Sequence, residues 1–279
     1  MNRKPKLVIG ANGFLGSHVT RRLVDAGEDV RVMVRPNANT IAIDHLDVTR
    51  FHGDIFDSAT LAEAMAGCDD VYYCVVDTRA WLRDPSPLFH TNVEGTRNVL
   101  AVAKDADLRR FVFTSSYATV GRRRGHVATE DDIINPRGLT PYVQSRVQAE
   151  ELVLRSAAES GLPAVAMCVS TTYGDGDWGR TPHGAFIAGA AFGKLPFLMK
   201  GIELEVVGVD DAARAMILAA EQLSALPDYD GLLRWVHMLG FRGHFTTKSR
   251  RFSVTLGSLR QARRRVPRVT ENRRDLVVK

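Results

Sequence analysis

The chain has 279 residues, of which 45% are apolar, and this is enough to bury a substantial core in one α/β domain. Its charge is divided, because residues 1–228 carry a net charge of −5 whereas residues 229–279 carry +10. No apolar run reaches the roughly 18–20 residues of a membrane span, and the three cysteines lack metal-ligand spacing. We therefore expect a cytoplasmic protein with free thiols, no metal site and no membrane partner.

The first informative segment is a strand, three glycines and a helix. Residues 7–9 form a short β-rich run. Glycines then recur at three-residue spacing, as Gly10, Gly13 and Gly16, before a helical apolar pattern and a second strand over residues 30–34. Such glycines allow a tight turn and let a diphosphate sit on the helix N-terminus. The segment predicts dinucleotide binding, and the alternative is a plain tight turn.

The residue at the end of the second strand bears on the choice of dinucleotide. An acidic residue there accepts hydrogen bonds from the ribose of NAD, whereas an arginine accommodates the additional phosphate of NADP. Arg35 occupies that position, and no acidic residue is near it. The sequence therefore favours NADP(H) over NAD(H), the alternative being that Arg35 is a solvated cation at a strand end.

Strand and helix patterns continue to alternate along the chain. Strands are expected within residues 48–57, 70–76, 109–116 and 162–170, and helices within residues 59–68, 92–106 and 140–161. This alternation is typical of a parallel sheet with helices on both faces. The predicted fold class is therefore α/β, a Rossmann-like doubly wound parallel sheet.

Seven stretches, in one order over residues 5–222, resemble the extended short-chain dehydrogenases/reductases. They are GANGFLGSHV, GDIFD, NVEGTRNVL, RRFVFTSSYATVG, PYVQSRVQAEE, YGDGDWGRTPHG and VGVDDAARA. That group includes dihydroflavonol reductases, 3β-hydroxysteroid dehydrogenases and nucleotide-sugar epimerases. The resemblance implies that residues 1–228 form an NAD(P)-binding Rossmann domain with a partial substrate lobe, mainly from about residue 171, and that the lobe is truncated.

The family's active site consists of a serine, a tyrosine and a lysine four residues after the tyrosine. The resemblance puts Ser116 and Tyr142 at the first two positions, while Arg146 stands where the family has lysine. A free tyrosine has a pKa near 10, so a cation one helical turn away favours its phenolate. Arginine keeps the charge but is larger than lysine, so the exchange is not conservative. The alternatives are a strand-end hydroxyl, an aromatic residue near a helix start and a solvated helix cation.

The resemblance also implies a set of dinucleotide-binding residues. They are Gly10, Asn12, Gly13, Phe14, Leu15, Gly16, Arg35, Asp54, Ile55, Tyr142 and Arg146. Asn92 matches a family asparagine that orders the active site, and the alternative is a helix N-cap. Asp77 lies where the family often has small residues near the nicotinamide ribose.

The segment after residue 228 has a different character. Residues 229–279 hold 13 lysines and arginines against three acidic residues. Within it, residues 230–265 resemble the C-terminal part of an actinobacterial replication initiator protein, in the blocks HMLGFRGHF, TKSRRFSVT and LRQARR. Arginines and lysines among phenylalanines suit weak phosphate contacts with nucleic acid, and the alternative is a disordered polycation. We interpret this segment as a basic tail joined from a different gene.

The sequence thus predicts an NADP(H)-dependent oxidoreductase. Its reaction would be hydride transfer on a carbonyl/alcohol pair of a small steroid-, flavonoid- or sugar-like substrate. A nucleotide-sugar epimerase/dehydratase and a non-catalytic dinucleotide-binding protein are the alternatives. The resemblance also implies a homodimer that pairs through helices.

Overall fold

The computed structural model describes residues 4–122, 125–126, 128–129, 132–194 and 205–222, and the backbone of a strand over residues 232–237. The chain divides into two units, residues 1–241 and residues 242–279. The second unit lies wholly outside the described residues, as does most of the segment interpreted as a basic tail.

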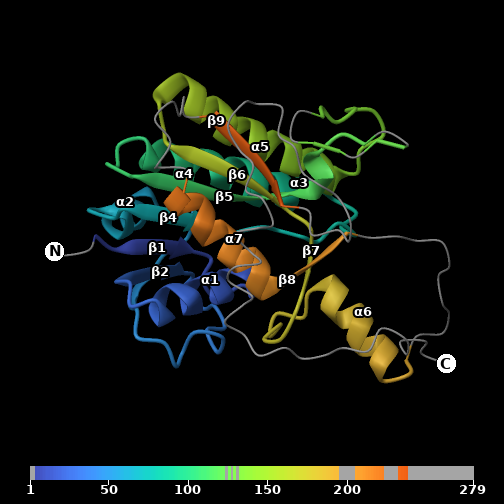
Figure 1. Cartoon of the computed structure of the whole chain (residues 1–279), viewed down its shortest axis with the longest axis horizontal. Coiled ribbons are helices and arrows are strands. Elements are labelled where there is room, and N and C mark those ends of the chain that lie inside the picture. Colours follow the sequence, from blue (N-terminus) through green and yellow to red (C-terminus); the bar gives the residue numbers. More distant parts are fainter. Residues whose placement is uncertain are drawn as a thin grey trace. The chain divides into compact units, whose positions relative to one another are not determined.

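A parallel sheet forms the centre of the first unit (Figure 1). Its strands are β1 (Lys6–Ile9), β2 (Val30–Val34), β3 (Thr49–His52), β4 (Asp70–Tyr73), β5 (Arg110–Ser116), β6 (Ala164–Val169) and β9 (Leu232–His237). Among the described residues the strand order is β3-β2-β1-β4-β5-β6-β9, and every pairing is parallel. The chain order reverses between β1 and β4, which is where sheets of this kind bind ligands at their carboxyl ends.

Helices cover both faces of the sheet. They are α1 (Phe14–Asp25), α2 (Ser58–Met65), α3 (Ser86–Phe89), the π-helix η1 (His90–Glu94), α4 (Gly95–Ala103), the 3-10 turn η2 (Tyr117–Thr119), α5 (Pro141–Ser160), α6 (Pro182–Ala191) and α7 (Val209–Gln222). Helices α2, α4 and α5 contact one another in sequence on one face, and α1 packs against α7 on the other. Four strands, β1, β4, β5 and β6, are buried at every residue, as expected for parallel strands covered on both sides.

The structure confirms the predicted strands and helices and adds three features to them. The helix expected over residues 92–106 begins earlier, because α3, the π-helical segment η1 and α4 follow one another without a break from Ser86 to Ala103. Helix α7, which the resemblance groups with the substrate lobe, packs on α1 and contacts β5 and β6 of the sheet as well as β7 and β8. Strand β9 pairs with β6 although its residues belong to the segment interpreted as the tail.

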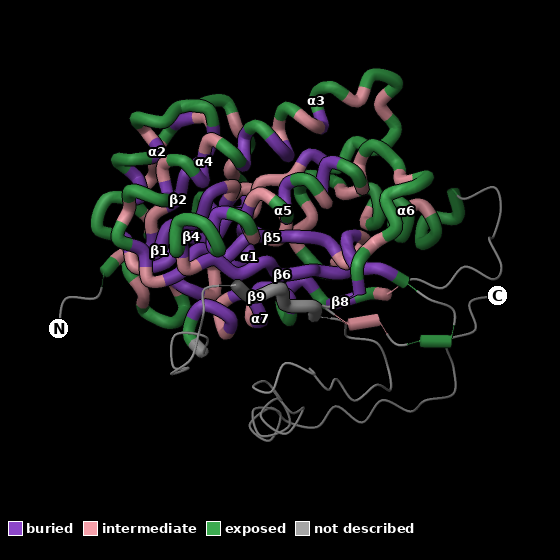
Figure 2. The backbone as a smooth tube through the Cα atoms, turned by 90° about the horizontal axis from the view of Figure 1, so that it is seen from above, coloured by how far each residue is buried: buried purple, intermediate pink, exposed green. Residues whose placement is uncertain are grey.

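The beginning of a second lobe lies beyond β6. Strands β7 (Thr171–Tyr173) and β8 (Val206–Gly208) form a separate parallel pair. Helix α6 is rich in apolar residues, yet none of its residues is buried, and its exposed course is visible in Figure 2. This lobe therefore covers little apolar surface within the described residues.

A buried ionic cluster closes the amino-terminal edge of the sheet. Lys6 Nζ lies 2.7 Å from Asp70 Oδ2 and 3.2 Å from Asp69 Oδ2. Arg109 reaches the same two carboxylates, at 2.5 Å for Asp70 and 3.1 Å for Asp69, and donates to the Ala220 carbonyl at 3.1 Å. The Asp70 side chain at the centre of this cluster is 1% exposed, whereas Asp69 and Arg109 are 27% and 30% exposed. The cluster joins β1, β4 and α7.

Over the residues that the structure describes, no helix is both long and apolar enough to cross a bilayer.

Candidate active site

The loop between β1 and α1 can be built only with glycine at two positions. Gly10 has φ +83°, a left-handed conformation that residues with a side chain rarely adopt. A Cβ on Gly16 would lie 2.2 Å from the carbonyl oxygen of Gly10, well inside contact distance. The Gly13 N–H donates to that same oxygen at 3.0 Å, which closes the turn. These glycines therefore bring helix α1 directly against the end of β1.

The N-terminus of α1 is suited to an anion. Its N-cap residue, Gly13, is exposed and has no side chain with which to cap the helix. The first turn, which begins with Phe14 and Leu15, contains no acidic residue. The first N–H groups of a helix and its dipole attract negative charge. This end of the helix therefore fits the diphosphate of a dinucleotide.

The other predicted dinucleotide contacts lie on the same edge of the sheet. Asn12 donates to the Asn39 carbonyl at 3.2 Å and so ties the glycine loop to the segment after β2. Arg35 directly follows β2, is exposed and makes no side-chain hydrogen bond with a described residue. Asp54 and Ile55 follow β3, where the Asp54 carboxylate accepts from the Phe56 N–H at 3.1 Å and Ile55 is buried. The structure thus places these residues at the carboxyl ends of three neighbouring strands.

The two serines at the end of β5 have different environments. The Ser115 hydroxyl donates to the Glu150 carboxylate, so its proton is already used. The Ser116 oxygen accepts from the Ala118 N–H at 3.2 Å, and no described residue accepts the Ser116 proton. Of the pair, only Ser116 can donate a hydrogen bond to a substrate without breaking one.

Arg146 is a core residue. It is 1% exposed, it donates to the Thr114 carbonyl, and its guanidinium carbon lies 5.1 Å from the centre of the Phe113 ring. Its Nε and Nη1 atoms are buried without a hydrogen-bond partner. Burial lowers the pKa of Arg146. The alternative of a solvated helix cation is therefore wrong.

Tyr142 lies in the first turn of α5, one helical turn before Arg146. Thr140 caps this helix by accepting from the Val143 N–H at 3.4 Å. The Tyr142 side chain is half-buried, and its hydroxyl makes no hydrogen bond with a described residue. Tyr142 and Arg146 therefore come from one helix, but the phenol lies nearer the surface and the guanidinium lies in the core.

Asn92 connects this helix to the loop after β4. It is fully buried, its amide oxygen accepts from the Asp77 N–H at 2.8 Å, and its amide nitrogen donates to the Asp77 carbonyl at 3.0 Å. The same nitrogen lies 3.0 Å from Ser145 Oγ, which donates to the Tyr142 carbonyl at 2.8 Å. Asn92 sits inside η1, so the N-cap alternative is wrong.

The family to which the chain belongs follows from a comparison with known protein families. The profile of the NAD dependent epimerase/dehydratase family matches residues 6–230, which include the glycine loop, Ser116 and Tyr142. The chain belongs to this family. The profile of a replication initiator protein, pSAM2, matches residues 198–277, as the resemblance in the tail suggested. The two matches overlap over residues 198–230.

Individual relatives within the family are reductases and dehydrogenases. A 2-alkyl-3-oxoalkanoate reductase of Shewanella oneidensis is 30% identical over 234 residues, which cover 80% of this chain and 59% of the relative. A 3-beta-hydroxysteroid dehydrogenase of Mycolicibacterium neoaurum is 28% identical over 233 residues, which cover 78% and 61%. The crystal structure of gox2253 has a TM-score of 0.75 and 34% identity, over 84% of this chain and 69% of that one. The chain spans about three-fifths of the length of these curated relatives.

Membership of the family implies a nicotinamide dinucleotide as cofactor. The exposed N-terminus of α1 and the close approach at Gly16 are what such a cofactor requires, so the residues present fit it. Within the described residues there is no group of three or more metal-ligating side chains.

Glu150 is a site residue that the sequence reasoning missed. It is 3% exposed and accepts hydrogen bonds from Ser115, from Thr119 at 2.7 Å and from Cys168 at 3.5 Å. These partners hold the residues on both sides of Ser116 and join them to β6. The signal was present, since Glu150 lies one turn after Arg146 on the buried face of α5.

We expect Glu150→Ala to lower the free energy of unfolding by about 1–3 kcal/mol, because it removes the carboxylate that accepts from the buried Ser115 hydroxyl. Equilibrium unfolding in urea measures this change. The matched control is Glu151→Ala, at the exposed neighbouring position. Equal stability of the two variants would mean that the hydrogen bonds of Glu150 to Ser115 and Thr119 do not stabilise the fold.

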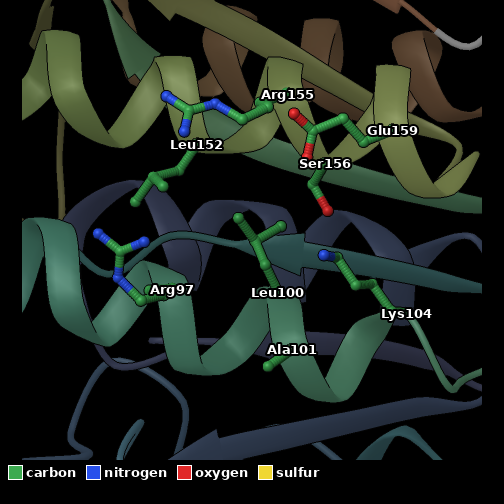
Figure 3. A pocket seen from close by; sticks show the side chains of 8 residues that line it. All are labelled: Arg97, Leu100, Ala101, Lys104, Leu152, Arg155, Ser156 and Glu159. Atoms are coloured by element: carbon green, nitrogen blue, oxygen red, sulfur yellow. The ribbon is translucent and has the colours of Figure 1, made fainter.

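A hollow of about 230 Å³ lies between α4 and α5 and is open to solvent (Figure 3). It is lined by Arg97, Leu100, Ala101, Lys104, Leu152, Arg155, Ser156 and Glu159. None of the candidate catalytic or dinucleotide-binding residues contributes to it. The hollow is therefore separate from the candidate active site.

Proposed function

We propose that the protein is an NADP(H)-dependent oxidoreductase that interconverts a carbonyl and an alcohol. The observation that carries this proposal is the pair of hydroxyls on Ser116 and Tyr142, neither of which donates to a described residue. The names of the reductase and dehydrogenase relatives support the reaction class. The exposed, glycine-lined helix terminus supports the dinucleotide requirement.

The proposed roles follow from these positions. Ser116 donates a hydrogen bond to the substrate carbonyl oxygen, and Tyr142 gives its proton to that oxygen as it becomes a hydroxyl. A nicotinamide dinucleotide held by the glycine loop at the N-terminus of α1 would supply the hydride for this reaction. Arg146, one helical turn after Tyr142 in α5, places a buried guanidinium at the position where the family has lysine. Asn92 fixes the position of the first turns of α5, and Glu150 fixes the position of the segment from Ser115 to Thr119 that contains Ser116.

The test begins with binding. Nicotinamide fluorescence is titrated with the purified full chain, and NADPH oxidation is then followed with a panel of ketones and aldehydes. Turnover supports the oxidoreductase. Binding without turnover supports the non-catalytic alternative, and interconversion of nucleotide-sugar epimers would support the epimerase alternative. A folded chain that binds neither NADPH nor NADH would overturn the proposal.

The preference for NADP(H) rests on Arg35. Arg35 is exposed at the end of β2, where a ribose phosphate would be recognised, and its side chain makes no hydrogen bond with a described residue. We expect Arg35→Ala to weaken NADPH binding about tenfold or more and to leave NADH binding nearly unchanged, since one charge-assisted contact contributes about 1.5–3 kcal/mol. Equal affinities for both dinucleotides, unaltered by the substitution, would contradict this preference.

A small neutral or anionic organic molecule is the proposed substrate, and the cytoplasm is the proposed location. The proposal of a shortened substrate lobe is supported by α6, which has no buried residue.

A homodimer is proposed through α4 and α5, where Leu100 and Leu152 form the apolar base of the hollow between charged residues (Figure 3). Sedimentation of the wild type and of Leu152→Glu, which would put a charge on that apolar base, tests the pairing.

A second proposed activity is weak binding of nucleic acid by residues 229–279. The net charge of +10 and the replication initiator match over residues 198–277 favour it. We expect the full chain to bind duplex DNA with an affinity that falls as salt rises, and the chain lacking residues 238–279 to lose this binding. Binding that persists in the shortened chain would contradict the assignment to the tail.

A further inference from the structure

The loop after β4, residues 74–85, leaves the sheet at its carboxyl edge and is connected to the start of α5 through Asn92. Its position is fixed, because Asn92 holds both the N–H and the carbonyl of Asp77 at 2.8 and 3.0 Å. Asn92 also bonds Ser145, whose hydroxyl donates to the Tyr142 carbonyl. The backbone at Asp77 is therefore tied, through Asn92 and Ser145, to the turn of α5 that carries Tyr142.

Asp77 binds Arg79 on one edge of the guanidinium. The carboxylate accepts from the Arg79 N–H at 3.0 Å, from Nε at 2.9 Å and from Nη2 at 2.5 Å. These hydrogen bonds from Arg79 lower the pKa of Asp77, so the pair stays charged through the neutral range. Asp77 is 9% exposed, which places the anchor of this pair inside the protein.

The opposite edge of the Arg79 guanidinium is open. Its side chain is 52% exposed, and Nη1 makes no hydrogen bond with a described residue. An arginine has two edges that can each hold a carboxylate or phosphate, and Asp77 uses one of them. Arg79 is thus oriented before any ligand arrives, which reduces the entropy that binding would cost.

The two carboxylates of this loop already accept hydrogen bonds within the protein. The loop has two acidic residues, and Asp84 is engaged by the N–H and the hydroxyl of Ser86 at 3.0 and 2.7 Å. The loop's second arginine, Arg83, is exposed and makes no side-chain hydrogen bond with a described residue. Arg83 is exposed like Arg79, but no carboxylate among the described residues orients it, so it serves as the matched control for Arg79.

We propose that Arg79, oriented by Asp77, binds an anionic group of the substrate, either a carboxylate or a phosphate. This inference rests on the proposed oxidoreductase function and narrows its substrate class to anionic carbonyl compounds. Trp81, which is 65% exposed on the same loop, offers an aromatic surface for the organic part of such a substrate.

The experiment measures binding of benzoate, phenyl phosphate and benzyl alcohol to the full chain by calorimetry. Wild type is compared with Arg79→Gln and with the control Arg83→Gln, each saturated with NADPH so that phosphate does not enter the dinucleotide site. We expect wild type and Arg83→Gln to bind at least one of the two anions about tenfold or more tightly than the alcohol, and Arg79→Gln to lose that difference. The stronger of the two anions identifies the group that is recognised.

Unchanged anion binding in Arg79→Gln, or no preference for anions in wild type, would overturn the proposal. Failure of NADPH to bind would instead contradict the proposed function, and the same three probes can then be measured on the protein without NADPH. A substrate pair that differs only in a carboxylate, 4-oxopentanoate and its methyl ester, provides a second measurement. Arg79→Gln should raise KM for the acid with little change in kcat and leave the ester unaffected.

Discussion

Replacing Tyr142 with phenylalanine should lower kcat for carbonyl reduction by about 10²–10⁴-fold, the usual contribution of a positioned proton donor. The phenol is half-buried in the first turn of α5, and its hydroxyl donates to no described residue, so the substitution breaks no hydrogen bond of the fold. Neither stability nor NADPH binding should change appreciably. Steady-state kinetics and nicotinamide fluorescence separate these effects.

Tyr117→Phe is the matched control for this substitution. Tyr117 directly follows Ser116, and its ring lies 5.0 Å from the Arg122 guanidinium carbon, a contact that phenylalanine preserves. We expect this control to keep kcat within a few fold of wild type, on the order of 1 kcal/mol or less in barrier. Full turnover by Tyr142→Phe would remove Tyr142 from proton transfer and leave Ser116 as the candidate.

Asp70→Ala should lower the free energy of unfolding by about 3–5 kcal/mol, the cost of leaving a buried charge without its partner. Asp70 is 1% exposed and lies 2.7 Å from Lys6 and 2.5 Å from Arg109. Its removal leaves Lys6 with Asp69, whose side chain is 27% exposed and therefore a weaker partner. Equilibrium unfolding in urea gives the change.

The control for the ionic cluster is an exposed ion pair. Glu94 and Arg97 lie 3.0 Å apart with side chains 53% and 56% exposed, so Glu94→Ala should cost about 0–1 kcal/mol. Asp70→Asn tests whether the charge or the volume matters, since asparagine keeps the shape. A cost for Asp70→Ala no greater than for Glu94→Ala would show that the cluster does not stabilise the sheet.

The fold was predictable because its signals are local. Three glycines after a β-rich run, followed by apolar residues at helical spacing, identify the first strand–helix unit without any long-range information. The repeated alternation then defines the parallel sheet. The π-helical segment His90–Glu94 was not predictable, because its composition does not distinguish it from an ordinary helix.

The residues of the candidate site could be predicted from the sequence, but their burial and hydrogen-bond partners could not. The resemblance assigned roles to Ser116, Tyr142 and Arg146 and did not reveal that Arg146 is buried against Phe113. Glu150 went unassigned, since its function as an acceptor depends on hydroxyls that lie more than 30 residues away in the chain. Arg79 was not predicted either, because its orientation depends on Asp77, whose backbone is held by Asn92.

By itself the sequence determined that a parallel α/β domain with a glycine-lined helix terminus precedes a strongly basic segment. These properties are periodicities and local charge, which neighbouring residues set together. Only the tertiary structure decided which hydroxyls keep a free proton, which arginine is buried and which retains an open edge. Those properties depend on burial and on partners that folding brings together from distant parts of the chain.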